Sequence, residues 1–132
     1  KAFSINAYHY SDKRHKTVAA RAWEQTVLQL LQGHATELKA MGQLQHAKGG
    51  IFHVDLCFKY PRSLFYNKMG QVSARTFDLT NVEKPIIDLI FNETMLTDDR
   101  SIVRVTSVKE AADSHSIEVF IKYLELDANP KP

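Results

Sequence analysis

The chain has 132 residues, of which 44% are hydrophobic and 24% are charged, and its formal net charge is +2. These values are typical of one soluble globular domain that builds its core without metal or disulfide staples. The single cysteine, Cys57, excludes an internal disulfide, and no apolar stretch is long enough for a transmembrane helix or a signal peptide. We therefore expect a cytoplasmic protein.

In chain order, the first expected element is a short strand or extended segment over residues 1–10. Apolar residues recur near helical spacing over residues 17–31, which predicts a helix that residues 35–41 could extend. Residues 43–50 lie among glycines and are expected to form a loop. Strict alternation over residues 51–60 predicts the clearest strand, with one apolar and one polar face.

The second half of the chain begins with residues 62–77, which are polar, aromatic and irregular and indicate a surface loop. A helix is predicted over residues 81–92, with its start placed so that Pro85 falls in the first turn. Residues 102–108 and 117–126 alternate as two strands, which pair most simply as a hairpin.

The resulting order β, α, β, α, β, β predicts the fold class. We expect a single α/β domain in which a mixed β-sheet is packed with two main helices. The domain is expected to cover residues 1–126, and residues 127–132 to form a flexible C-terminal tail.

The most distinctive feature is an acidic unit around the start of the predicted helix. It reads Asp78-Leu79-Thr80-Asn81-Val82-Glu83-Lys84, followed by Asp88 and then by Asp98-Asp99. Hard cations such as Mg²⁺ take oxygen ligands, usually one or two carboxylates, and keep several waters for substrate phosphates. A nearby lysine can act as a point charge for phosphate. Together these groups indicate a divalent metal held beside a phosphate.

Each of these groups also has a purely structural interpretation. Asp78 would gain a few tenths to about 1 kcal/mol at the positive end of a helix, and Asp98-Asp99 can be an acidic turn before a strand. The run Thr80-x-x-Glu83 fits a capping box. Lys84 and Asp88 can form a surface ion pair worth about 0.2–0.5 kcal/mol. Taken one at a time, the structural interpretation is favoured for Asp78 and for Asp98-Asp99.

Basic residues gather mainly near the N-terminus. The candidates for contacts with nucleic-acid phosphates are Lys13, Arg14, Lys16, Arg21 and Arg75. A net charge of +2 supports such a partner only weakly, and a short basic run can equally be a solvated turn. The neighbouring acidic unit favours the phosphate-binding interpretation. The sequence has neither a Gly-rich phosphate loop nor a Gly-x-Ser-x-Gly nucleophile elbow, which argues against kinases, dehydrogenases and serine hydrolases.

The acidic unit resembles the motif of the RusA-like Holliday-junction resolvases of bacteria and their phages. That motif is Asp-x-(Asp or Thr)-Asn-x-x-Lys, an aspartate four residues past the lysine, and Asp-Asp before a strand. The positions that match it are Asp78, Thr80, Asn81, Lys84, Asp88, Asp98 and Asp99. The likeness extends to the expected strand at residues 50–62 and to those at residues 101–109 and 116–126.

This resemblance implies a RusA-like fold and a Mg²⁺-dependent, structure-selective DNA endonuclease, with Mn²⁺ able to replace Mg²⁺. It implies a homodimer of bacterial or phage origin that resolves four-way (Holliday) junctions by symmetric nicking, with no membrane partner. The residues that it assigns to the site are the catalytic Asp78, Lys84 and Asp99, the further metal ligands Asp98, Asp88 and Thr80, and the site-ordering Asn81.

Two alternatives stay open at this point. The better-known version of the motif has aspartate where this chain has Thr80, so the scaffold could be a non-catalytic junction- or DNA-binding protein with an altered site. The acidic unit could also be a structural helix start in an unrelated α/β domain.

Overall fold

The computed structural model describes the backbone of residues 2–5, 16–73, 76 and 79–125, and the side chains in these ranges from residue 22 onward, except that of Thr80. The elements are β1 (Ala2–Ile5), α1 (Lys16–Gln32), α2 (Ala35–Lys48), β2 (Ile51–Pro61), α3 (Arg62–Phe65), α4 (Leu79–Ile87), the π-helix η1 (Asp88–Met95), the 3₁₀ turn η2 (Asp99–Ser101), β3 (Ile102–Ala112) and β4 (Ser116–Leu124). The predicted helix over 17–31 and the predicted strand over 51–60 are confirmed as α1 and β2. The expected tail at 127–132 lies outside the described residues.

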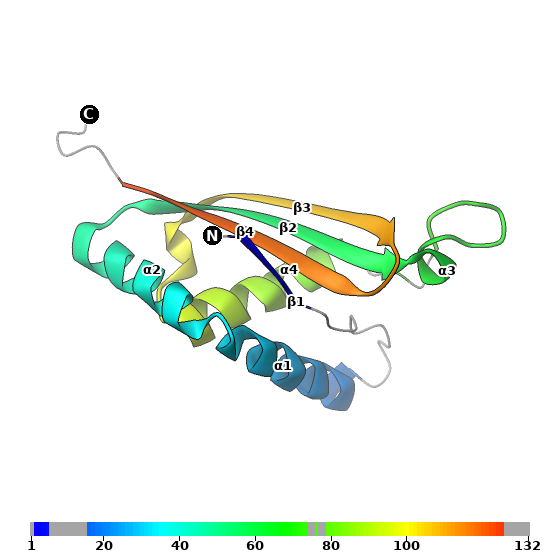
Figure 1. Cartoon of the computed structure of the whole chain (residues 1–132), viewed down its shortest axis with the longest axis horizontal. Helices are drawn as coiled ribbons and strands as arrows, with labels where there is room; N and C mark the ends of the chain where they lie inside the picture. The colour runs from blue at the N-terminus through cyan, green and yellow to red at the C-terminus, as the bar shows by residue number, and fades with distance from the viewer. Residues whose placement is uncertain (1, 6–15, 74–75, 77–78, 126–132) are drawn as a thin grey trace.

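The four strands form one mixed sheet in the order β1-β4-β2-β3 (Figure 1). Inside the sheet, β2 is parallel to β3 and antiparallel to β4, while β1 pairs antiparallel with β4. The helices α1, α2 and α4 lie on one side of the sheet, and none of the described helices lies on the other side. The predicted α/β class with a mixed sheet is confirmed, with three long helical segments where two were expected.

The core lies between the sheet and these helices. The alternation of β2 is realised as predicted, because its inward residues are at most 2% exposed: Phe52, Val54, Leu56, Phe58 and Tyr60. The predicted apolar face of the acidic helix is also buried, and it consists of Val82, Ile86, Leu89 and Ile90. The rings of Phe52 and Phe91 pack edge to face with their centroids 5.3 Å apart, and this contact links β2 to η1. Each such buried side chain stabilises the fold by roughly 1.5–3 kcal/mol.

The loop predicted over residues 43–50 is wrong, because α2 continues through Lys48. Gly42 suggests a break when read in the sequence, but it lies buried inside α2. A Cβ atom there would stand 2.2 Å from the carbonyl oxygen of Met95, so the missing side chain lets η1 approach α2 closely. The chain turns only at Gly49 and Gly50, whose φ angles of 71° and 104° favour glycine.

The predicted hairpin between the last two strands is also wrong. β3 and β4 do not pair with each other, since β2 lies between them and bonds to both. The short connection that follows Ala112 therefore passes over the end of β2, where the His115 ring contacts Tyr60 at 5.6 Å. Alternation marks a strand and its faces but carries no information on which neighbour the strand selects.

The acidic helix begins at Leu79, close to the predicted start, and places Pro85 inside its second turn. From Asp88 onward it widens into the π-helix η1, in which the Thr94 hydroxyl donates to the Leu89 carbonyl, five residues back. Proline removes a backbone donor, and such irregular turns are a common response within helices. The element ends at Leu96, whose φ of 57° is left-handed.

The expected surface loop over residues 62–77 contains more structure than predicted. It begins with the short helix α3, whose Phe65 is buried, and Tyr66 bridges to Val72. No helix among the described residues combines the length and the apolar character that spanning a membrane requires.

Candidate functional site

Three of the predicted site residues follow one another along the acidic helix. Asn81 and Lys84 are exposed, and Asp88 is partly exposed at the first residue of η1. The Lys84 ammonium lies 3.4 Å from both carboxylate oxygens of Asp88, and the Asn92 amide donates to Asp88 at 3.4 Å. Because the Lys84 side chain is 76% exposed, this i, i+4 pair is a weak surface contact and leaves the ammonium accessible to a phosphate.

The start of α4 is anchored to β3 by Glu83. The Ser107 hydroxyl donates to a Glu83 carboxylate oxygen at 2.5 Å. Thr80 lies inside α4, one residue past its first, and its side chain is not described. The capping box considered for Thr80-x-x-Glu83 stays a prediction, and the described contact of Glu83 is its bond to β3, which fixes α4 against the sheet.

The second acidic group lies at the turn before β3. Asp98 caps η2, and its two carboxylate oxygens accept from the backbone N–H and from the Nε of Arg100, each at 2.8 Å. These bonds, the backbone one first, hold the pKa of Asp98 below its ordinary value. Asp99 follows as the first residue of η2 and is partly exposed. Asp98 is thus an ionised carboxylate near neutral pH, already bound to a guanidinium.

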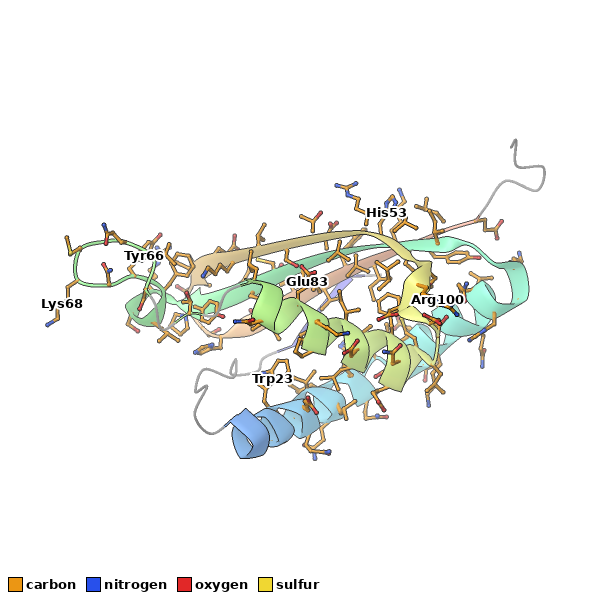
Figure 2. All side chains as sticks on the ribbon, turned by 180° about the vertical axis from the view of Figure 1, so that it is seen from behind. Trp23, His53, Tyr66, Lys68, Glu83 and Arg100 are labelled. Atoms are coloured by element: carbon orange, nitrogen blue, oxygen red, sulfur yellow. The ribbon has the colours of Figure 1, made fainter. Side chains whose placement is uncertain are left out.

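The start of α4 and the turn before β3 lie at opposite ends of the α4–η1 element. Figure 2 shows Glu83 near one end and Arg100, next to Asp99, beyond the other. The separation follows from β3, because Glu83 bonds Ser107 while η2 immediately precedes Ile102. The strand rises about 17 Å between Ile102 and Ser107. Among the described residues, no three acidic, histidine or cysteine side chains gather closely enough to hold a metal ion.

Several predicted residues lie partly or wholly outside what the structure describes. Asp78, Lys13, Arg14 and Arg75 are outside the described residues, and Asp78 is bonded to Leu79, the first residue of α4. Lys16 and Arg21 lie in α1, with their backbone alone described. The basic residues predicted to hold DNA therefore stay a prediction.

Further basic side chains lie on the sheet itself. Lys109 of β3 donates to the Thr76 hydroxyl at 3.1 Å, close to the loop that leads into α4. On the sheet face without helices, the register aligns His53 of β2 with Arg104 of β3 and with Lys122 of β4. Figure 2 shows His53 on that open face. The alternation indicates which residues share a face, but only the strand order aligns them in a row.

A comparison with protein families agrees with this architecture. The chain matches the family described as endodeoxyribonuclease RusA over residues 5–122, a range that includes the whole acidic unit and all of β2 and β3. No curated protein matches the sequence closely enough to count as a relative. The family match removes the alternative in which the acidic unit belongs to an unrelated α/β domain.

Proposed function

Because this chain belongs to the endodeoxyribonuclease RusA family, we propose that it is a divalent-metal-dependent nuclease that resolves four-way DNA junctions by symmetric nicking as a homodimer. The family itself makes the chain an endonuclease of the Holliday-junction-resolving type. The observation that carries the proposal is the family match across the complete acidic unit. A two-fold symmetric dimer suits a pseudo-symmetric junction, because two equivalent sites then face two equivalent strands.

The proposed metal ligands are all oxygen donors, the type that Mg²⁺ and Mn²⁺ take. They are Asp78 and Asp99, assisted by Asp98, Asp88 and Thr80. When bound, such an ion activates water and offsets negative charge on the phosphate. Asp98 and Asp99 fit this donor set as neighbouring carboxylates on a turn, with Arg100 keeping Asp98 ionised. Arg100 also competes for Asp98, so Asp99 is the better ligand of the two.

Lys84 is proposed to contact the scissile phosphate and to stabilise the charge that develops on it. Its exposed ammonium is held beside Asp88 from within the same helix, which limits its rotamers without burying it. Glu83 and Ser107 fix the start of α4 on the sheet, so the positions of Lys84 and Asn81 are set by a rigid element. Catalytic groups gain from such positioning, since small misplacements cost large factors in rate.

The separation of the acidic groups supports a specific role for the dimer. Within one protomer, the start of α4 and Asp99 lie at opposite ends of the α4–η1 element. We propose that each metal site is completed by two protomers, with Asp78 from one and Asp99 from its partner. This arrangement would make dimerisation a requirement for cleavage.

The first test measures nicking of a labelled four-way junction and of a linear duplex, with Mg²⁺, Mn²⁺ or EDTA present. We expect metal-dependent paired nicks in the junction alone, and their loss in Asp78→Asn and in Asp99→Asn. Junction binding without nicking by the wild-type protein would refute the proposed nuclease activity and favour the alternative, a DNA-binding scaffold altered at Thr80.

Subunit mixing separates a shared site from a site within one protomer. Refolding Asp78→Asn and Asp99→Asn together produces heterodimers in which a shared arrangement contains one intact site. Random assembly then restores about a quarter of the wild-type number of sites. If each site were built within one protomer, every site would carry a substitution and no nicking would return. The control is the Asp78→Asn variant refolded alone under the same conditions.

The DNA arms are proposed to lie against the basic residues at the N-terminal side of the chain, through their phosphates. These residues are Lys13, Arg14, Lys16, Arg21 and Arg75. Replacing any one of them with alanine should weaken junction binding and reduce its salt dependence, with little effect on which strand is cut.

A further inference from the structure

The outer edge of β3 is the longest open strand edge among the described elements. β3 is the last strand of the sheet and has eleven residues, and Figure 1 shows no described element beyond it. The opposite edge is β1, with four residues. An open edge presents unpaired backbone N–H and C=O groups that can bond to another strand. β3 also carries two of the exposed large hydrophobic residues, Val103 and Val108.

The side chains of β3 fit an antiparallel copy of the same strand. With a two-fold axis at Ser107, Arg104 lies opposite Glu110 of the second copy, and the pair occurs twice. Both side chains are exposed and lie on the sheet face that the described helices leave uncovered. Thr106 and Val108 lie on the same face and would form the next pairs, closer to the two-fold axis. Opposite charges and β-branched residues directly across two strands are favourable pairs.

Other registers lose this match. Moving the axis by one residue along the strand, to Thr106 or Val108, places Arg104 opposite Val108 or Ala112. An axis between two residues would pair an inward with an outward side chain. Charges on edge strands often prevent pairing, but here opposite signs stand at equal distances on either side of Ser107.

We infer that β3 pairs antiparallel with β3 of a second copy of this chain, with the two-fold axis at Ser107 and reciprocal Arg104–Glu110 ion pairs across it. This inference rests on the homodimer of the proposed function and identifies its interface. It joins two sheets into one of eight strands. It also places the turn that carries Asp99 beside the far end of the partner's β3, the end at which α4 begins.

A charge-reversal cycle tests the interface. We expect Arg104→Glu and Glu110→Arg each to weaken dimerisation at least tenfold in sedimentation equilibrium, and the double variant to regain most of the loss. Lys122→Glu is the matched control, since it makes the same charge change on the same face but on the interior strand β4. Thermal unfolding of each variant shows that it is folded, which matters because Glu110 also pairs with Lys59.

Three outcomes would overturn the inference: a monomeric wild-type protein, single variants that dimerise normally, or a control that is weakened as much as they are. Nicking by the same variants separates this inference from the proposed function. Normal dimerisation and normal nicking by Arg104→Glu would reject the β3 interface and leave the nuclease proposal intact. A dimer that responds as expected but never nicks junctions would reject the nuclease and keep the interface.

Cross-linking tests the register independently. In a Cys57→Ser background, Thr106→Cys and Val108→Cys should form a disulfide with each other when the two variants are mixed, because those positions face each other across the axis. Each variant alone should cross-link at least tenfold less. The register would be overturned if a mixture of Thr106→Cys and Lys122→Cys cross-linked as much as the mixture of Thr106→Cys and Val108→Cys.

Discussion

Gly42 lets α2 and η1 pack closely against each other, and Gly42→Ala should disrupt this contact. The new Cβ atom would stand 2.2 Å from the Met95 carbonyl oxygen, whereas real Cβ atoms essentially never come within 3.0 Å of another heavy atom. Relieving the contact requires α2 and η1 to separate by about 1 Å, since carbon atoms prefer 3.5–4.0 Å. Overpacking of this kind costs typically about 1–3 kcal/mol.

A gain in helix propensity opposes that cost. Alanine is better than glycine inside a helix by about 1 kcal/mol. Because the clash is with backbone and not with a flexible side chain, we take the upper part of the overpacking range. The net loss of stability is then about 2 kcal/mol, which corresponds to a fall in Tm of roughly 6–8 °C for a domain of this size.

Thermal and urea unfolding followed by circular dichroism measure this effect, and Gly33→Ala is the matched control. A Cβ atom at Gly33 would lie 3.5 Å from the Leu30 carbonyl oxygen, an ordinary contact. We expect the control to unfold within about 1 kcal/mol of the wild type. The proposed nuclease should also lose nicking, because Met95 precedes the turn that carries Asp99. A Gly42→Ala variant as stable as the control would refute the close packing of α2 on η1.

Three further predictions concern single side chains. Lys84→Ala should leave Tm nearly unchanged, because an exposed i, i+4 pair contributes about 0.3–0.5 kcal/mol, yet it should abolish junction nicking at unchanged junction binding. Burial first, then Glu110 and Glu118, raises the pKa of Cys57 to about 11, so its thiol should react with a disulfide reagent at pH 8 about tenfold more slowly than in the urea-unfolded chain. Equal rates in the two states would contradict this environment. Arg100→Gln should raise the pKa of Asp98 only part of the way to its ordinary value in an NMR titration, because the backbone N–H, the largest cause, remains. Because the pKa of Asp98 is lower in the folded state, its carboxylate stabilises the fold at pH values above the ordinary carboxyl pKa. This contribution is lost as the pH falls through the folded-state pKa. A pKa of Asp98 that returns fully to its ordinary value in Arg100→Gln would show that the guanidinium alone lowers it.

The sequence by itself determined the local features that depend on periodicity. Alternation identified β2 and its buried face, and helical spacing identified α1 and the buried stripe of the acidic helix, because both patterns follow directly from backbone geometry. The order of acidic, amide and lysine groups was enough to indicate the nuclease family, which the family match confirmed. Asp78, Lys84 and Asp99 remain predicted catalytic residues.

Only the tertiary structure decided which elements meet. Gly42 looks like a helix end in the sequence, and only the approach of η1 explains why α2 continues through it. The order that inserts β2 between β3 and β4 depends on long-range pairing, which alternation does not encode. The same strand order leaves the edge of β3 open. The α4–η1 element connects the parallel strands β2 and β3, so it must run back along the sheet, and this sets the start of α4 far from Asp99. Lys84 and Asp99, which belong to one sequence motif, are therefore separated within one protomer, and the proposed dimer would bring such groups together.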